Sequence, residues 1–465
     1  MSKARIKYKR RIMMKKYDVI IIGGGPAGYK AAEHLAALKK KVCIVDFADE
    51  RIGGTCLNEG CVPVKAMIES AHLFINMRRS ADFGIESGEI KTDMGAVRTA
   101  ASKKMDFLRM ALYSSLKSQG IDFIFGAASF VSENVIKIDS RELEAEYFIV
   151  ASGSVPRKLS IEGFGQALDS AQILAKGFSG NKILIVGGGY IGCEFASLYR
   201  AFGKDVTVLE ALPSLLAMED EDISRALERE FKKQGIGVIK GSALKSLSAD
   251  KAGVSARIDQ NGRSSEEKFD AVLSAVGRRS RTEDLNAAAA GIEILPSGAI
   301  AVDDSMRTNV HNIYAAGDVI ESPMLAHTAY REGASAAGAI AGIRAEKINY
   351  IAVPRVVFSF PQIGAIGMTE KAAASRGIET KTHKSFFAAN AKAVIAGEPE
   401  GFLKIISSVS DGVILGAAVV GADACELIHL LAPAVSRAMT VKHAAEVMYG
   451  HPTLSEIVSD TLSKI

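Results

Sequence analysis

The sequence predicts an α/β protein with two parallel sheets and a C-terminal α+β region. A repeat is the first reason: the run DVIIIGGGPAG, beginning at Asp18, recurs as KILIVGGGYIG, beginning at Lys182. Each copy is a continuous apolar strand, as a buried parallel sheet requires, followed by clustered glycines and a helical pattern. The second reason lies in residues 346–465, where we expect strands over 353–358, 402–407 and 413–420, followed by helices.

The glycines of the repeat follow the pattern G-x-G-x-x-G, with Gly23, Gly25 and Gly28 in the first copy and Gly187, Gly189 and Gly192 in the second. A second strand follows each helix, over 41–45 and 205–209, and leads into an acid, Asp46 or Glu210. Such glycines let a pyrophosphate approach the backbone at a helix N-terminus, and the carboxylate accepts hydrogen bonds from ribose hydroxyls. The repeat therefore predicts two Rossmann-like dinucleotide sites.

The second site should prefer NAD to NADP. Glu210 would repel a 2′-phosphate, and residues 211–220 contain no Arg or Lys to neutralise one.

Two cysteines five positions apart, Cys56 and Cys61, follow the first dinucleotide signature. In a regular helix their Cα atoms would lie roughly 8–9 Å apart, whereas a disulfide tolerates only about 7 Å. A bond would need a distorted turn, which Gly60 permits, and strained disulfides are the reducible ones. The alternatives are two unconnected thiols or, less favoured, a metal site; we expect no metal. A sulfur pair between two dinucleotides suggests an electron relay with a flavin as middle carrier.

Composition narrows the class of protein. The 465 residues are 48% hydrophobic, enough for two to four domains. Five cysteines favour a reducing, cytoplasmic location. No uncharged apolar run approaches the length of a membrane span, so we expect no membrane partner. Cys43, Cys193 and Cys425 are expected to be small core residues.

The net charge of +4 comes from the N-terminus, which carries eight basic residues and no acid within residues 1–16. The rest of the chain is net negative by four charges. We expect residues 1–15 to be a disordered basic extension. An organelle presequence, a nucleic-acid arm and an over-long reading frame are alternatives. We assign the extension no function and expect no nucleic-acid partner.

Five motifs in this order resemble the flavoprotein pyridine nucleotide–disulfide oxidoreductases, most closely the members that oxidise dihydrolipoamide. They are the cysteine run at 53–65, with Val64 where the family often has Ser, and the segments 151–156, 276–279, 308–319 and 450–456. The resemblance runs from about Tyr17 to the C-terminus. It implies an FAD-binding domain at 16–148 and 275–345, an inserted NAD-binding domain at 149–274, and a dimerisation domain at 346–465.

The resemblance also implies the cofactor sites. FAD would be bound by Gly23, Gly25, Gly28, Asp46, Gly54, Thr55, Lys65, Ser152, Gly153, Asp318 and Ala326. The helix that opens at His327 would direct its N-terminus at the flavin. NAD would be bound by Gly187, Gly189, Tyr190, Gly192, Glu194, Glu210 and Gly277. For Tyr190, capping of the flavin and plain packing remain alternatives.

The catalytic residues are implied in the same way. Cys56 and Cys61 would form a redox-active disulfide, Cys56 exchanging with substrate and Cys61 lying nearer the flavin. Lys65, paired with Glu194, would stabilise the reduced flavin.

His451 would be the base, delivered across a homodimer interface to Cys56 of the other subunit, and Glu456 would orient it. Thr453 to Glu456 also reads as a capping box, with Thr453 as N-cap, and both roles stay open. A cis His451–Pro452 bond is compatible with the sequence.

The implied reaction is FAD-dependent oxidation of protein-bound dihydrolipoamide to lipoamide, with reduction of NAD to NADH. The implied partner is the lipoyl domain of a 2-oxoacid dehydrogenase or glycine-cleavage complex. One alternative is another disulfide reductase of the family, similar to glutathione reductase. A remoter alternative is a non-catalytic flavoprotein with a binding role.

Overall fold

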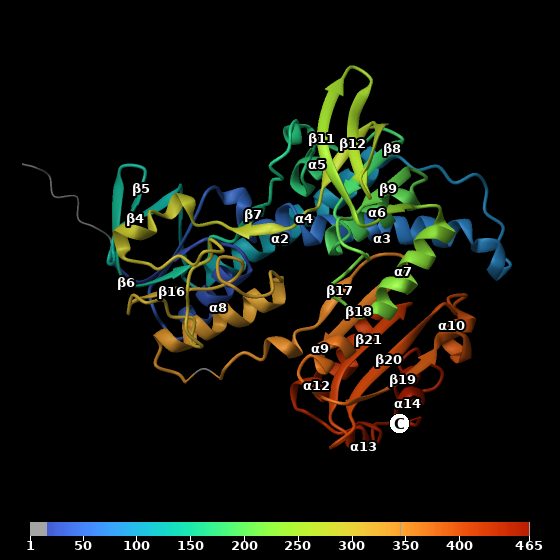
Figure 1. Cartoon of the computed structure of the whole chain (residues 1–465). Helices are drawn as coiled ribbons and strands as arrows, with labels where there is room; N and C mark the ends of the chain where they lie inside the picture. Colours follow the sequence, from blue (N-terminus) through green and yellow to red (C-terminus); the bar gives the residue numbers. More distant parts are fainter. Residues whose placement is uncertain (1–15, 345, 465) are drawn as a thin grey trace, which may run out of the picture. The chain divides into compact units, whose positions relative to one another are not determined.

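A computed structural model describes residues 16–344 and 346–464 (Figure 1). The basic extension at 1–15 lies outside the described residues. The described chain divides into two compact units. Unit 1 contains residues 16–56, 108–155, 279–344 and 346–348, and unit 2 contains 57–107, 156–278 and 349–464. The chain passes between the units within α2 (Gly54–Asn58), α4 (Met94–Ser118), β7 (Ser154–Pro156) and β15 (Arg278–Ser280).

Unit 1 is built on a mixed sheet with a parallel core. Four parallel strands lie in the order β3 (Asp122–Phe125), β2 (Val42–Asp46), β1 (Lys16–Ile22) and β6 (Arg141–Val150). β16 (Ile313–Ala315) joins the end of β6 in parallel, and β5 (Val135–Ile138) and β4 (Ala128–Ser132) add an antiparallel edge. Every residue of β2 is buried, which explains its continuous apolar sequence.

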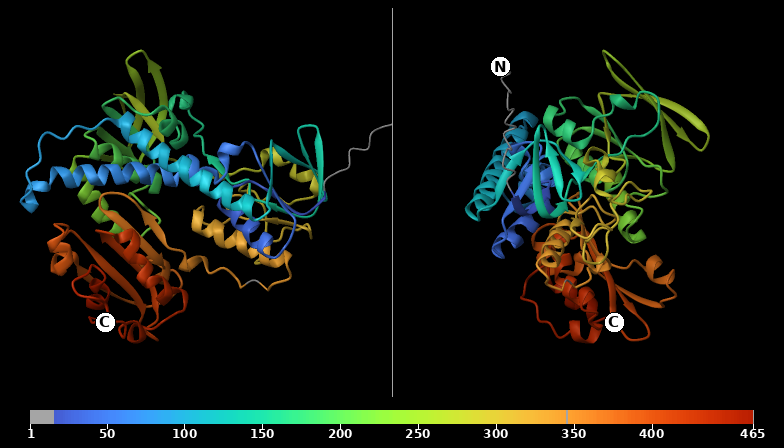
Figure 2. Two further views of the ribbon diagram at one scale, coloured as in Figure 1. Left: turned by 180° about the vertical axis from the view of Figure 1, so that it is seen from behind. Right: turned by 90° about the vertical axis from the view of Figure 1, so that its left-hand side faces the viewer.

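Two helices of unit 1 lie against each other, α1 (Pro26–Ala37) and α8 (Ala326–Ile340) (Figure 2). Their backbones approach closely at Gly333, where a Cβ atom would lie 2.1 Å from the carbonyl oxygen of Ala27. Only glycine fits at this crossing.

Unit 2 contains the second copy of the repeat. Its parallel sheet has the order β10 (Gly237–Ile239), β9 (Asp205–Leu209), β8 (Lys182–Val186) and β14 (Ala271–Ser274). The strands are connected through α6 (Tyr190–Ala201) and α7 (Glu221–Gln234), and α3 (Cys61–Arg78) packs against α6. An antiparallel sheet follows β10 and consists of β11 (Ser242–Asp250), β12 (Gly253–Gln260) and β13 (Arg263–Phe269). A short helix, α5 (Ser170–Lys176), precedes β8.

The C-terminal part of unit 2 is a five-stranded antiparallel sheet, whose strands lie side by side in Figure 1. The order is β17 (Arg355–Val357), β18 (Gln362–Gly367), β21 (Ile414–Gly421), β20 (Gly401–Ser408) and β19 (Thr380–Phe386). Short helices accompany it: α9 (Glu370–Ala374), α10 (Ala391–Ile395), α11 (Ala424–Leu427), α12 (Ala432–Ser436), α13 (Val441–Ala444) and α14 (Glu456–Leu462). The predicted fold class is confirmed: two Rossmann-like sheets and a C-terminal α+β region.

Two strands of this last sheet were not predicted. β18 contains Gly364, where a Cβ atom would lie 2.4 Å from the carbonyl oxygen of Ala424, so the close approach of α11 dictates a residue that usually weakens a strand. β19 reads TKTHKSF, a polar strand at the edge of the sheet. Neither has the apolar run that predicts a core strand.

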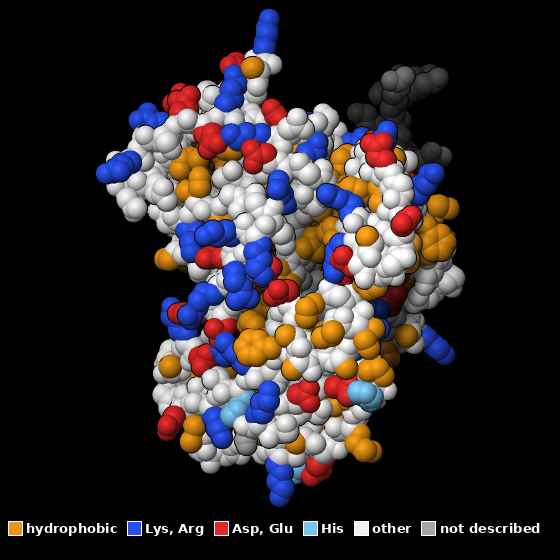
Figure 3. Space-filling view, turned by 90° about the vertical axis from the view of Figure 1, so that its right-hand side faces the viewer, with side chains coloured by type: hydrophobic (Ala, Val, Ile, Leu, Met, Phe, Trp, Pro, Cys, Tyr) orange, Lys and Arg blue, Asp and Glu red, His pale blue; other side chains and the backbone are white. Residues whose placement is uncertain are grey.

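The charges on the surface are mixed. On the face shown in Figure 3, Lys and Arg side chains are interspersed with Asp and Glu. Among the described residues, no helix combines the length and the apolar character that crossing a membrane requires.

Candidate functional site

The two glycine motifs have the same hydrogen-bonding geometry. In unit 1, the Gly24 amide donates to Asp46 Oδ2 at 2.7 Å. In unit 2, the Gly188 amide donates to Glu210 Oε2 at 2.5 Å. The second oxygen of each acid accepts another amide, from Phe47 or Leu212, at 2.7 Å. Each carboxylate is therefore fixed at the carboxyl end of its strand, and each oxygen keeps a lone pair for a ribose hydroxyl.

The glycines of the two motifs differ in what a Cβ atom placed on each of them would contact. At Gly28 and Gly192 a Cβ would lie 1.9 Å from the carbonyl oxygen of Gly23 or Gly187, so these glycines allow the helix to pack on the strand. At Gly189 a Cβ would meet no atom within 4 Å, and at Gly25 only Gly54 Cα, at 3.7 Å. This open space at each helix N-terminus fits a dinucleotide pyrophosphate.

Other residues predicted to bind FAD lie in unit 1. Ser154 Oγ donates to Asp318 Oδ2 at 2.6 Å, and Ser152 Oγ donates to the carbonyl oxygen of Arg281 at 2.7 Å. Gly54 has φ +64°, and a Cβ there would lie 2.6 Å from Gly25 Cα, so α2 begins against the glycine loop. Thr55 follows in α2, Gly153 has φ +75°, and Ala326 is the first residue of α8. Gly277, predicted for NAD, accepts a hydrogen bond from the Arg157 amide in unit 2.

Two features of this region were not predicted. The fully buried Glu332 accepts a hydrogen bond from the Gly317 amide at 2.7 Å, and so holds the turn that carries Asp318. A glutamate among the small residues of α8 is the sequence signal that could have revealed the role of Glu332.

Burial raises the pKa of Asp46, and amide hydrogen bonds from Gly24 and Phe47 oppose that shift.

Lys65 of α3 and Glu194 of α6, predicted as partners, are brought together in unit 2. Lys65 Nζ lies 2.6 Å and 2.7 Å from the two carboxylate oxygens of Glu194, whose side chain is only 6% exposed. The Phe358 amide donates to Glu194 Oε1 at 3.1 Å, and Lys65 Nζ lies 5.0 Å from the Phe358 ring centroid. The lysine is thus held as a positioned cation.

The two cysteines of the predicted pair lie on different helices. Cys56 is half-buried in α2, and Cys61 is the exposed first residue of α3. A turn at Glu59 and Gly60 separates the helices, which is the interruption that a disulfide at this spacing requires.

The other three cysteines are buried, as predicted. Burial raises the pKa of the Cys425 thiol to about 12, and burial also raises that of Cys193. Few thiolates form at neutral pH at these two positions, so their thiols are poor nucleophiles.

His451 and Glu456 form a second predicted pair. His451 Nδ1 lies 2.9 Å from Glu456 Oε1, and the imidazole side chain is 73% exposed. The Thr453 amide donates to Glu456 Oε2 at 2.8 Å. Hydrogen bonds from that amide and from His451 hold the pKa of Glu456 below its usual range. The His451–Pro452 peptide bond is cis.

The capping box at this position is only half formed. Glu456 accepts the Thr453 amide, but the Thr453 hydroxyl donates to the carbonyl oxygen of Gly450 at 2.7 Å. The sequence predicts Thr453 as the N-cap of this helix. That prediction is wrong, because α14 begins at Glu456. The carboxylate instead bridges the turn and the imidazole.

Tyr190 contacts two residues that the sequence did not single out. Its hydroxyl donates to Glu219 Oε1, and Arg355 Nε donates to the same oxygen at 2.8 Å. The sequence feature that could have pointed to Glu219 is an acidic run, EDED, at 219–222.

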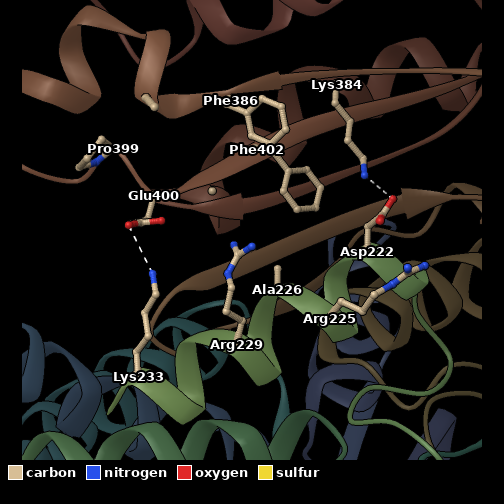
Figure 4. A pocket seen from close by; sticks show the side chains of 12 residues that line it. Asp222, Arg225, Ala226, Arg229, Lys233, Lys384, Phe386, Pro399, Glu400 and Phe402 are labelled. Carbon is tan, nitrogen blue, oxygen red and sulfur yellow. Dashed lines mark hydrogen bonds and ion pairs between the residues drawn. The ribbon is translucent and has the colours of Figure 1, made fainter.

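A groove of about 640 Å³ lies elsewhere in unit 2, between α7 and strands β19 and β20 (Figure 4). Ion pairs cross it from Lys384 Nζ to Asp222 Oδ2 at 2.5 Å and from Lys233 Nζ to Glu400 Oε1 at 3.4 Å. Phe386 and Phe402 line its strand side. No predicted site residue lines this groove.

Comparison with known proteins identifies relatives along nearly the whole chain. A dihydrolipoyl dehydrogenase of Bacillus subtilis (strain 168) is 36% identical over 449 residues, covering 95% of both chains. One from Chlamydia muridarum is 36% identical over 456 residues, covering 97% of both. Among solved structures, the HOCl-induced flavoprotein disulfide reductase RclA from Escherichia coli, as its Cu(II) complex, superposes with a TM-score of 0.88. It is 27% identical and covers 97% of this chain and 100% of its own.

Two family models match the sequence. Residues 17–333 match the pyridine nucleotide-disulphide oxidoreductase family, and residues 353–462 match the dimerisation domain of that family. The chain therefore belongs to the pyridine nucleotide–disulphide oxidoreductases and carries their dimerisation domain.

Proposed function

We propose that the protein oxidises protein-bound dihydrolipoamide to lipoamide and reduces NAD to NADH, with FAD as its prosthetic group. The observation that carries this proposal is the His451–Glu456 pair. An exposed imidazole whose Nδ1 is held by a carboxylate keeps Nε2 for proton transfer, as dithiol oxidation requires. The relatives named dihydrolipoyl dehydrogenase support the choice of substrate.

The two glycine motifs take the two cofactors. Gly23, Gly25, Gly28, Asp46 and Asp318 would hold FAD, and Gly187, Gly189, Gly192 and Glu210 would hold NAD. Bound FAD supplies a two-electron carrier between the dithiol and NAD⁺. Lys65, fixed by Glu194, would place a positive charge where negative charge develops.

The chemistry of the chain's own residues is thiol–disulfide exchange. A substrate thiolate attacks Cys56 Sγ in the Cys56–Cys61 disulfide, and Cys61 leaves as a thiolate. The second substrate thiolate then attacks the substrate sulfur bound to Cys56, which closes the lipoyl ring and expels the Cys56 thiolate. Two electrons pass from substrate to the cysteine pair, and His451 accepts a proton released from the substrate thiols.

The dimerisation domain supports a homodimer. In that homodimer, His451 of one subunit would serve Cys56 of the other. The macromolecular partner we propose is the lipoyl domain of a 2-oxoacid dehydrogenase or glycine-cleavage complex, in the cytoplasm. The assignments of individual site residues, and the division into FAD, NAD and dimerisation domains, are part of the same proposal.

A second candidate is another disulfide reductase of the family, which the likeness to RclA supports. The two are separated by incubating the FAD-loaded protein anaerobically with dihydrolipoamide and NAD⁺, and in parallel with glutathione disulfide and NADPH. NADH formation in the first mixture and no NADPH consumption in the second is the expected result. The opposite pattern would refute the dihydrolipoamide assignment.

A further inference from the structure

We propose that Glu219 is a positioning residue for NAD, which holds Tyr190 beside the second glycine loop in a buried contact shared with Arg355. This inference rests on the proposed NAD site. It adds two residues, Glu219 and Arg355, that no dinucleotide motif contains.

The contact is buried and pairs opposite charges. Tyr190 hydroxyl and Arg355 Nε both donate to Glu219 Oε1, the latter at 2.8 Å. The Glu219 side chain is 1% exposed and that of Arg355 is 22% exposed. Arg355 places an opposite charge beside the buried carboxylate, which offsets part of the cost of burying it and leaves Oε1 to accept the phenol hydroxyl.

The other carboxylate oxygen of Glu219 takes no part in this contact. Glu219 Oε2 is buried and has no hydrogen-bond partner among the described residues. The arrangement instead uses one oxygen for two donors, one of which is Tyr190.

The backbone ties Glu219 to the glycine loop. The Glu219 amide donates to the carbonyl oxygen of Leu216 at 2.8 Å, and the Leu216 amide donates to that of Gly188 at 2.9 Å. The Gly188 amide in turn donates to Glu210. The segment 210–219 therefore follows the loop, and Tyr190, the first residue of α6, is anchored to it by its side chain.

A segment of the C-terminal domain supports this face of α6 at two points. Arg355 of β17 reaches Tyr190 through Glu219, and the Phe358 amide, just beyond β17, donates to Glu194. Tyr190 and Glu194 are four residues apart and share one face of the helix. The contact thus fixes an aromatic ring one residue after Gly189, where the pyrophosphate is proposed to bind.

Loss of the phenol hydroxyl should release this ring and weaken NAD binding without removing any group that reacts. Tyr190→Phe is the cleanest change, because it removes only the hydroxyl and leaves the Glu219–Arg355 ion pair in place. We expect the Kd for NAD⁺, measured by titration calorimetry on the FAD-loaded dimer, to rise about 5- to 10-fold. This factor corresponds to the free energy that one such hydrogen bond contributes. The KM for NAD⁺ should rise in parallel, and by a larger factor than any change in kcat or in the KM for dihydrolipoamide.

Two further variants make the test specific. Tyr199→Phe removes the same atom from another tyrosine of α6 and should leave the Kd unchanged. In a Glu219→Gln background, Tyr190→Phe should have a much smaller effect than in the wild type, because the two residues act as one unit. Equal Kd values for wild type and Tyr190→Phe, or fully additive effects, would overturn the proposal. Wild-type protein that binds no NAD⁺ would overturn the proposed function as well.

Discussion

Lys65 Nζ lies within 2.7 Å of both carboxylate oxygens of Glu194, although 129 residues separate the two in the chain. Glu194 is nearly buried, and its oxygen Oε1 also accepts the Phe358 amide. A lysine held in this way keeps its charge at a fixed place. The pair joins α3, which begins at Cys61, to α6, which begins at the second glycine motif.

Removing one partner of this pair should destabilise the protein. We expect Glu194→Gln to lower the free energy of unfolding by about 1–3 kcal/mol, because a half-buried ammonium group loses its counter-ion. Urea denaturation of the FAD-loaded protein would measure this. Lys268→Gln, which breaks the exposed Lys268–Asp250 pair at 2.7 Å, is the control and should cost much less, because solvent screens that pair. Equal losses would show that burial does not distinguish the two pairs.

Two glycines of one motif should differ when each is changed to alanine. At Gly189 the added Cβ meets open space, so Gly189→Ala should fold with a nearly unchanged Tm yet bind NAD⁺ at least about tenfold more weakly. At Gly192 the Cβ would lie 1.9 Å from the carbonyl oxygen of Gly187, so Gly192→Ala should lower the Tm itself. Thermal melts and NAD⁺ titrations of both variants check this. Full NAD⁺ affinity in Gly189→Ala would mean that the open space is not the nucleotide site.

Replacing the proposed base should slow turnover without loss of FAD. We expect His451→Gln to reduce kcat with dihydrolipoamide by about 10²- to 10⁴-fold, the usual contribution of a general base. Bound flavin is quantified by its absorbance after gel filtration. Glu456→Gln should have a smaller effect in the same direction, because it only orients the imidazole. Turnover near the wild-type rate in His451→Gln would refute its role as the base.

The lowered pKa of Glu456 predicts a pH dependence of stability. Its hydrogen bonds from Thr453 and His451 favour the ionised form, so their stabilising effect is present above the unfolded pKa of about 4.3. That effect is lost as the pH falls through the lower folded pKa. The Tm difference between wild type and Glu456→Gln should therefore shrink between neutral pH and pH below 4. A difference that stays constant over this range would contradict the assignment.

Most of the fold could be predicted because its signals are local. The apolar strands, the glycines and the acids after the second strands are contiguous patterns, and both copies of the repeat appear where the sequence indicates them. Strand β19 was missed because an edge strand need not be apolar, and β18 because Gly364 serves contact with α11.

The partners of the site residues were harder to predict. The bonds from Tyr190 and Arg355 to Glu219 join residues up to 136 positions apart, and no motif contains both ends. Glu332 likewise holds the turn before Asp318 from a helix that reads as a run of small residues. Such contacts follow from tertiary packing, which spacing along the chain does not encode.

The central claim is that Cys56 and Cys61 accept the electrons of dihydrolipoamide. It is tested most directly by alkylating the FAD-loaded protein anaerobically, before and after one equivalent of dihydrolipoamide, and locating the label by peptide mass spectrometry. The account predicts that both cysteines resist labelling before the addition and become labelled after it, while the buried Cys43, Cys193 and Cys425 do not change. Equal labelling of Cys56 and Cys61 in both samples would contradict it.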